Sequence, residues 1–294
     1  MKRIFSILML AVIAIGCSQA SANSSYKKPD APERKGWSSE LPLYGDVESI
    51  TAASYVLEDK FGEITRSKTE GKSIVYFNEA GDVTEHIKYN SDGTLFRKYI
   101  YKYDAAGNMT EEAVYYSEGS LDYKYIRKYD DKGNMTEMAR YYSEGSLYDK
   151  AIYKYDAAGN RTEEAWYDWL YSDGSLYDKR IWKYDAAGNV IEEAWYNYDS
   201  SLNFKDIYKY DAAGNMTEEA LYNSDGSLFY YKLIYKYDAA GNMTEDAKYN
   251  SDGSLDYKYI YNYDDVGNVT GWTEYVGEIM TPIEEVECKI VYRK

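Results

Sequence analysis

The sequence predicts an all-β protein, an antiparallel meander of tandem two-strand repeats that forms an elongated, twisted or coiled sheet. Three observations predict this fold. A unit of about 26 residues recurs eight times between residues 77 and 275. Polar and apolar residues alternate within each unit, as in strands that bury one face. Each unit also contains two turn signals, which leave no segment long enough for a helix. The alternative is a sheet that closes into a barrel.

The repeat begins with an aromatic residue followed by Asp or Asn, and its consensus reads YKYDAAGNMTEEA. A divergent first copy starts at Phe77-Asn78. The seven later copies start at Tyr103, Tyr129, Tyr155, Tyr184, Tyr210, Tyr237 and Tyr263. Successive copies are 26 residues apart, except for two spacings of 29 and 27. A period this regular indicates a repeat architecture in which each unit packs on its neighbours.

Each unit reverses direction twice. In the first turn, Asp104 stands first and Gly107 fourth, an order that suits a type I turn followed by a left-handed glycine and a β-bulge. The equivalent glycines are Gly81, Gly107, Gly133, Gly159, Gly188, Gly214, Gly241 and Gly267. The second turn has a similar order of residue types, with a polar residue first and Gly fourth, as in Asn223-Ser224-Asp225-Gly226.

The alternation assigns residues to two faces once a register is chosen. We take the register in which Asp130 pairs with Asn134. One face then gathers Leu121, Tyr123, Tyr125, Tyr129, Met135, Ala139 and Tyr141. The other gathers Lys124, Ile126, Lys128, Thr136 and Met138. The first face is the more apolar and is predicted to be the interior, whereas the second is predicted to be wet, with cross-strand charge pairs.

The N-terminus resembles the signal of a bacterial lipoprotein. Lys2 and Arg3 precede an apolar run at residues 4–15, too short to span a bilayer. The sequence AIGC that ends at Cys17 resembles a lipobox, which implies that residues 1–17 are removed and that Cys17 is acylated and anchors the protein in a membrane. The alternative is ordinary cleavage after residue 22. The Ser-, Lys- and Pro-bearing residues 18–46 are predicted to be a flexible tether.

The motif Tyr-x-Tyr-Asp-x-x-Gly-Asn-x-Thr at residues 101–110 resembles the YD repeat of RHS-type proteins, with a weaker likeness to bacterial MORN-type repeats. The resemblance covers about residues 50–294, and it implies a β-sheet fold or a partial RHS-like shell. Residues 47–76 are predicted to be a degenerate repeat that leads into the array, residues 77–275 the repeats, and residues 276–294 a strand that caps the last edge. Because only about 30 residues follow the last motif, a toxin domain is not expected, and a remnant of a toxin-delivery system is one interpretation.

The composition argues against several function classes. A net charge of −16 disfavours nucleic-acid binding. The adjacent acids Glu111 and Glu112 point to opposite faces of a strand, so they cannot act as a catalytic carboxylate pair. His86 is the chain's one histidine and is predicted to be a surface strand residue, whereas Cys288 is predicted to be a buried thiol. We therefore expect no enzyme, no catalytic residue, no metal site and no cofactor.

Four of the six tryptophans crowd residues 166–195. They are Trp166, Trp169, Trp182 and Trp195. In the chosen register Trp166 and Trp195 lie on the wet face, where exposed rings would hold a sugar or a peptide; the alternative is packing within the sheet. The sequence thus predicts an outer-membrane or cell-surface lipoprotein (alternatively periplasmic or secreted) that binds a carbohydrate or protein ligand. A structural or spacer protein of the cell envelope is the alternative function.

Overall fold

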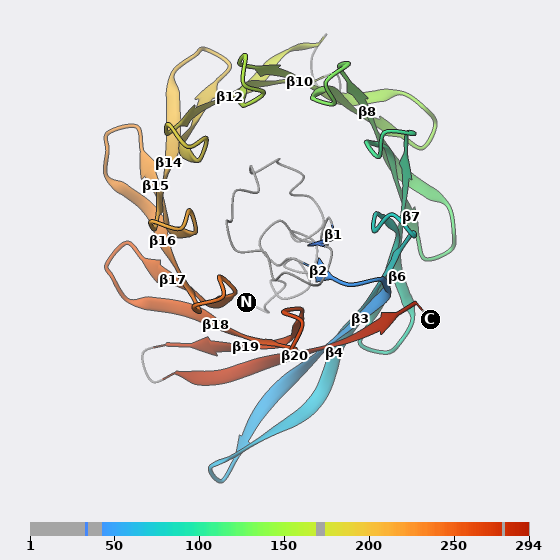
Figure 1. Cartoon of the computed structure of the whole chain (residues 1–294), viewed down its shortest axis with the longest axis vertical. Coiled ribbons are helices and arrows are strands. Elements are labelled where there is room, and N and C mark those ends of the chain that lie inside the picture. Colours follow the sequence, from blue (N-terminus) through green and yellow to red (C-terminus); the bar gives the residue numbers. More distant parts are fainter. Residues whose placement is uncertain (1–32, 35–42, 169–173, 278–279, 294) are drawn as a thin grey trace. The chain divides into compact units, whose positions relative to one another are not determined.

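The computed structural model describes residues 33–34, 43–168, 174–277 and 280–293, and these residues form twenty strands. The first strands are β1 Glu33–Arg34, β2 Leu43–Tyr44, β3 Val47–Lys60, β4 Glu63–Phe77, β5 Val83–Asn90 and β6 Leu95–Tyr103. The middle strands are β7 Met109–Tyr116, β8 Leu121–Tyr129, β9 Met135–Tyr142, β10 Leu147–Tyr155, β11 Arg161–Asp168, β12 Ser175–Tyr184 and β13 Val190–Asn197. The last are β14 Leu202–Tyr210, β15 Met216–Asn223, β16 Leu228–Tyr237, β17 Met243–Asn250, β18 Leu255–Tyr263, β19 Val269–Val276 and β20 Thr281–Tyr292. The predicted all-β meander is therefore confirmed (Figure 1).

The hydrogen-bonded strand order closes on itself, so the expectation of an open, elongated sheet is wrong and the alternative of a closed barrel is right. Strands β3 to β20 each pair with their neighbours in the sequence, and β20 also pairs with β3. The closing pairs run from Glu284↔Val56 to Tyr292↔Val47. Since β20 pairs with β19 on its other side, the last strand does not cap an edge, and the barrel leaves no edge among these eighteen strands.

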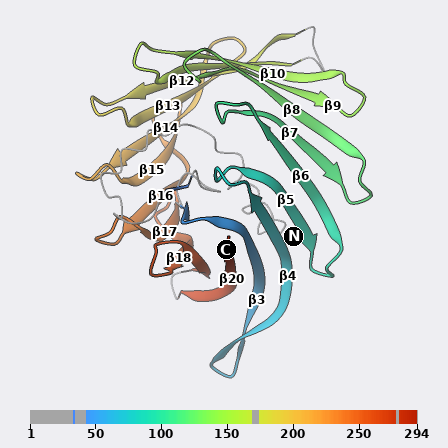
Figure 2. The ribbon, with the colours of Figure 1, turned by 45° about the vertical axis from the view of Figure 1, so that its right-hand side comes forward.

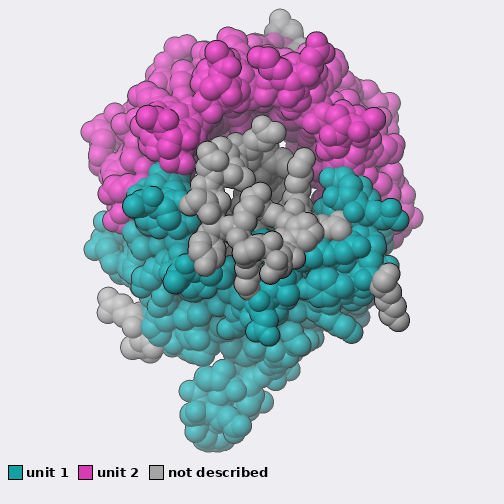
Figure 3. Space-filling model, viewed as in Figure 1, with its two compact units in different colours: residues 1–97, 210–217, 233–294 teal, residues 98–209, 218–232 magenta. Residues whose placement is uncertain are grey.

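The chain divides into two compact units, which Figure 3 colours separately. Unit 1 contains residues 1–97, 210–217 and 233–294, and unit 2 contains residues 98–209 and 218–232. Unit 1 has an apolar core in which Leu43, Val47 and Ile50 are 0 to 2% exposed. The buried residues of unit 2 are of mixed character and include Val114, Trp182 and carboxylates such as Glu112 and Glu164.

The first turn of each repeat is stabilised by its own Asp. The Asp104 carboxylate accepts hydrogen bonds from the backbone N–H groups of Ala106 and Asn108, both at 2.9 Å, and from the Asn108 amide at 3.0 Å. The backbone N–H of Gly107 donates to the Asp104 carbonyl at 3.1 Å. All eight turn glycines named above have φ between 82° and 98°, in the left-handed region where glycine has no steric penalty.

The Tyr that precedes this Asp joins neighbouring repeats. The Tyr129 hydroxyl donates to the backbone carbonyl of Met109 in the preceding repeat, at 2.7 Å. The same bond recurs from Tyr155, Tyr184, Tyr237 and Tyr263, with lengths of 2.5 to 2.8 Å. The Tyr-Asp signature is thus explained by structure: the Asp organises the turn and the Tyr ties the turn to the previous repeat.

The predicted turn pairing is confirmed, but the predicted faces are half wrong. The Asp130 N–H donates to the Asn134 carbonyl at 2.9 Å. A β-bulge follows at once between Lys128 and Tyr129, and it shifts the register by one residue. Ile126 therefore lies opposite Ala139, not opposite Met138. Because side chains alternate with a period of two, this shift moves the return-strand residues to the other face.

Strands β3 and β4 form a hairpin that extends past its neighbours (Figures 1 and 2). Pairing with β20 stops at Val56, and pairing with β5 begins at Gly71. Residues 57–70 are therefore a two-stranded ribbon. Its turn is formed by Phe61 and Gly62 with φ of 63° and 88°, and Phe61 is fully exposed.

Candidate functional site

One face of the sheet, which we call the charged face, has a ladder of ion pairs. Each rung is a Glu on a return strand between two Lys on the flanking strands. In unit 2 the rungs are Lys128–Glu137–Lys150, Lys154–Glu163–Lys179, Lys183–Glu192–Lys205 and Lys209–Glu218–Lys232, with N···O distances of 2.6 to 3.7 Å. The first Lys of each rung has a side chain that is 61 to 65% exposed. Each rung therefore has a formal charge of +1 in a chain whose net charge is −16.

A tyrosine accompanies each rung on this face. The Glu137 carboxylate raises the pKa of Lys128, and the nearby Tyr141 adds a smaller effect in the same direction. Tyr167, Tyr196 and Tyr222 act in the same way on the first Lys of the next three rungs. Neighbouring rungs are two strands apart, which corresponds to about 9.6 Å. The charged face of unit 2 thus repeats an exposed ammonium beside a half-buried tyrosine at a constant spacing.

The opposite face, which we call the packed face, buries charged groups in pairs. In unit 2 four acids each lie beside an arginine. The pairs are Glu112–Arg127 at 2.7 Å, Asp149–Arg140 at 2.5 Å, Glu164–Arg161 at 3.0 Å and Glu193–Arg180 at 3.7 Å. Ionised groups tolerate burial when each has a partner of opposite charge. The buried charges of the packed face are therefore neutralised in pairs.

Trp166, Trp182 and Trp195 lie on the packed face, so the predicted position of Trp166 and Trp195 on the wet face is wrong. Trp166 lies opposite Ala151 in the register of β10 and β11, and its indole N–H donates to Glu164. Trp182 is 8% exposed and has the Arg161 guanidinium 4.6 Å from its ring centre. For Trp166 and Trp195 the cause is the equivalent β-bulge of their own repeats, between Lys154 and Tyr155 and between Lys183 and Tyr184. Trp169 lies outside the described residues.

Trp195 belongs to the same face. Its ring lies 4.7 Å from that of Phe204, and the Arg180 guanidinium is 5.4 Å from its centre. Each of the three described rings therefore has packing partners. Their role in binding a ligand stays a prediction.

His86 also departs from its predicted exposure, because it is buried and 3% exposed. Its Nε2 is 2.6 Å from the hydroxyl oxygen of Ser73, which is equally buried. Burial, with a further effect of Lys88, lowers the pKa of His86 to about 3. Although a Ser–His pair can serve as nucleophile and base, this pair is closed to a substrate and its imidazole is a weak base.

The packed face of unit 2 contains one buried acid, Asp206, that has no ion pair with an arginine among the described residues. Asp206 on β14 lies directly opposite Glu193 on β13, and Asp206 is 6% exposed. The Tyr208 hydroxyl donates to the Glu193 carboxylate at 3.3 Å. Burial and the neighbouring Glu219 and Glu193 raise the pKa of Asp206 to about 8. We call Glu193, Asp206 and Glu219 the acid cluster.

Aromatic rings border the acid cluster. Trp195 and Phe204 form a directly opposed pair on β13 and β14, two residues along from Glu193 and Asp206. Burial, Glu219 and Asp206 raise the pKa of Tyr231 to about 12, which indicates that its hydroxyl is near both acids. All three rings are partly exposed, whereas Asp206 is buried. Asp206 therefore lies deeper than the rings.

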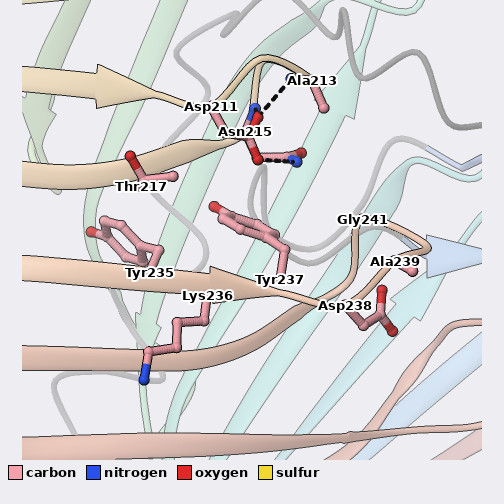
Figure 4. Close-up of a pocket in the computed structure, with 10 residues that line it drawn as sticks. All are labelled: Asp211, Ala213, Asn215, Thr217, Tyr235, Lys236, Tyr237, Asp238, Ala239 and Gly241. Carbon is pink, nitrogen blue, oxygen red and sulfur yellow. Dashed lines mark hydrogen bonds between the residues drawn. The ribbon is translucent and has the colours of Figure 1, made fainter.

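Figure 4 shows an open recess of about 510 Å³ in unit 1, between two successive turns. Tyr235 and Tyr237 line it beside the turns that begin at Asp211 and Asp238. Two of its polar groups make hydrogen bonds within the chain. Asp211 accepts from the backbone N–H groups of its own turn, and the Tyr237 hydroxyl donates to a backbone carbonyl. We interpret the recess as the gap between neighbouring repeats.

The structure of the chain resembles those of porin-like proteins and of a Tc toxin. A porin-like protein from Bacteroides uniformis matches over 83% of this chain and 96% of that chain, with 12% identity and a TM-score of 0.44. A porin-like protein from Bacteroides vulgatus matches over 84% and 99%, with 11% identity and a TM-score of 0.36. The Photorhabdus luminescens Tc holotoxin pore matches over 79% of this chain but 16% of that chain, with 12% identity and a TM-score of 0.32.

At the level of sequence, no protein-family model matches the chain and no curated protein matches it. Within the described residues, no helix is long and apolar enough to cross a membrane. Likewise, no group of three or more His, Cys, Asp or Glu in that part of the chain could hold a metal ion.

The two cysteines complete the set of predicted sites. Cys17 lies outside the described residues. Cys288 is 7% exposed on β20, and burial raises the pKa of its thiol to about 12, so it remains protonated and unreactive.

The acid cluster was missed by sequence reasoning, although the repeat contains a signal for it. Six other repeats hold Tyr, Ala, Arg or Leu at the position of Asp206. These residues are Tyr99, Tyr125, Ala151, Arg180, Leu233 and Tyr259. Asp206 is the one acid in this series, and aligning the repeats by their second strand would have shown it.

Proposed function

We propose that this chain is a non-enzymatic, envelope-anchored binding protein whose charged face holds a repeating anionic glycan. The observation that carries the proposal is the row of four rungs in unit 2, each with an exposed Lys beside a tyrosine. A lysine ammonium pairs with a carboxylate or sulfate, and a tyrosine ring supplies a surface for the apolar side of a sugar. The spacing of about 9.6 Å between rungs suits a polymer that presents one acidic group at a similar repeat.

The position in the envelope rests on the signal sequence. The lipobox ending at Cys17 would supply the anchor, at the outer membrane or the cell surface. Both faces of the described sheet have charged residues, Lys–Glu rungs on one face and Arg–acid pairs on the other. In a transmembrane barrel the face toward lipid is an apolar band, and charges there cost several kcal/mol.

The supported activity is binding, not catalysis. The Ser73–His86 pair is buried, and the turn carboxylates are occupied by their own turns. A structural or spacer role is the competing function, and it predicts no retention on any glycan.

The test measures retention on immobilised polygalacturonate, a polymer with a carboxylate on every sugar, with neutral dextran as the reference. The test variant changes the exposed Lys of each rung to Gln: Lys128→Gln, Lys154→Gln, Lys183→Gln and Lys209→Gln. The control variant changes four exposed lysines away from the ladder: Lys60→Gln, Lys68→Gln, Lys132→Gln and Lys289→Gln.

We expect the wild type and the control to bind polygalacturonate and not dextran, and the test variant to bind at least about tenfold more weakly. Added salt should weaken binding of the wild type. Circular dichroism should show that both variants fold, since surface pairs contribute under about 1 kcal/mol each. Equal losses in the two variants, or no binding by the wild type, would refute the glycan proposal.

A further inference from the structure

On the packed face of unit 2, four acids lie beside an arginine, whereas Asp206 does not. Four acids, Glu112, Asp149, Glu164 and Glu193, each have an arginine nitrogen within 3.7 Å. Asp206 has no ion pair with a Lys or Arg in the described part of the chain, and its Oδ1 is buried there without a hydrogen-bond partner. The Oδ1 of Asp149 is also without one, but Asp149 is bound to Arg140 through its other oxygen. A buried carboxylate oxygen without a donor costs free energy unless a ligand or a proton satisfies it.

The surroundings of Asp206 are acidic. Glu193 lies directly across from it, and Glu219 acts on it electrostatically. Two arginines act on Glu193: Arg180 lies 3.7 Å from Glu193 and 3.9 Å from Asp178, and Arg161 is paired with Glu164 at 3.0 Å. Carboxylates in such proximity cannot all be ionised without an additional positive charge.

The aromatic rings beside the acid cluster indicate which kind of cation fits there. Trp195, Phe204 and Tyr231 are partly exposed around the buried Asp206. Aromatic faces attract organic cations, and indole does so most strongly. Since the described acids do not form a metal site, a cation with apolar substituents fits better than a bare ion.

We propose that Asp206, with Glu193, Glu219 and the rings of Trp195, Phe204 and Tyr231, binds the primary ammonium group of a ligand. The ammonium donates to the Asp206 Oδ1, and its alkyl chain lies against the rings. In the other pairs on this face, an arginine of the chain has the same role toward its acid. The ligand is either a small alkylamine or a lysine side chain of a peptide.

The repeat sequence supports a ligand-directed role for this acid. At the position of Asp206 other repeats hold Tyr125, Ala151 or Leu233. The strand and its pairing form equally well with apolar residues there. An acid that the fold does not need, placed without a partner of opposite charge, indicates recognition of something outside the chain.

The experiment uses the whole protein and two ammonium probes, n-butylamine and the blocked peptide acetyl-Gly-Lys-Gly-amide. Acetyl-Gly-norleucine-Gly-amide is the neutral reference. Binding is measured by calorimetry at pH 8.5, where both probes are cationic. The variants are Asp206→Asn, which keeps the shape and removes the charge, and Asp131→Asn, which removes one exposed acid elsewhere in unit 2.

We expect saturable binding of at least one ammonium probe by the wild type and by Asp131→Asn, and none of the norleucine peptide. Asp206→Asn should bind at least about tenfold more weakly. Binding of butylamine identifies a small amine as sufficient, whereas binding of the lysine peptide alone identifies a peptide. Binding of neither probe, equal binding of the norleucine peptide, or unchanged binding by Asp206→Asn would overturn the proposal. The four-lysine variant of the charged face should bind the ammonium probes normally, which separates this site from the glycan surface.

Discussion

Replacing Asp206 with Leu should stabilise the protein, and by an amount that depends on pH. The folded protein raises the pKa of Asp206 from 3.8 to about 8, because the side chain is buried and faces Glu219 and Glu193. Between these two values the unfolded chain has an ionised Asp and the folded chain a protonated one. Stability contributed by this residue therefore falls as the pH rises from about 4 to about 8, and it is constant above that.

The size of the effect follows from the same shift. One unit of pKa corresponds to about 1.36 kcal/mol, so the full shift sets an upper limit of about 6 kcal/mol. Because Asp206 shares the site with other acids, we expect about 2–4 kcal/mol at pH 9. Leu is tolerated at the equivalent position, where the chain has Leu233. At pH 4 Asp206 is largely protonated in the folded chain and half protonated in the unfolded chain, so this cost is nearly absent. The free energies of unfolding of Asp206→Leu and the wild type should then differ mainly by the burial of the apolar Leu side chain.

The assay is urea unfolding of the wild type and Asp206→Leu at pH 4, 6.5 and 9. Glu112→Leu is the matched control, because it removes a buried acid that is paired with Arg127 at 2.7 Å. That change leaves a partly buried guanidinium without this carboxylate and should destabilise by about 1–3 kcal/mol. A gain for Asp206→Leu that is equal at all three pH values, or a loss of stability at pH 9, would show that Asp206 is not held in an unfavourable site.

Three further outcomes are expected. Phe61→Asn should raise the free energy of unfolding by about 1 kcal/mol, because Phe61 has φ of 63° in a two-residue hairpin turn that favours Asn-Gly; chemical denaturation measures it, and a destabilised variant contradicts it. Trp166→Ala combined with Trp195→Ala should lower stability by about 2–4 kcal/mol, because both rings pack within the sheet; an unchanged melting temperature would place the rings outside the packing. Cys17→Ser should abolish incorporation of labelled palmitate, and equal labelling of the variant would exclude the lipid anchor.

Short-range chemistry made much of this fold predictable. The carboxylate of Asp104 bonds the residues two and four positions on, so one repeat contains everything that its turn requires. The same holds for the left-handed φ of Gly107, which follows from its place in the motif. The number of strands and their antiparallel order follow from these turns, because each turn reverses the chain.

The tertiary structure alone decided which residues share a face and how the sheet ends. The β-bulges between Lys154 and Tyr155 and between Lys183 and Tyr184 each move the following return strand by one residue. Since the period of a strand is two, Trp166 and Trp195 thereby move to the packed face. Closure joins residues as distant as Ser54 and Glu284, which are 230 positions apart. The burial of Asp206 against Glu193 likewise depends on the pairing of two strands, which no local pattern in the sequence contains.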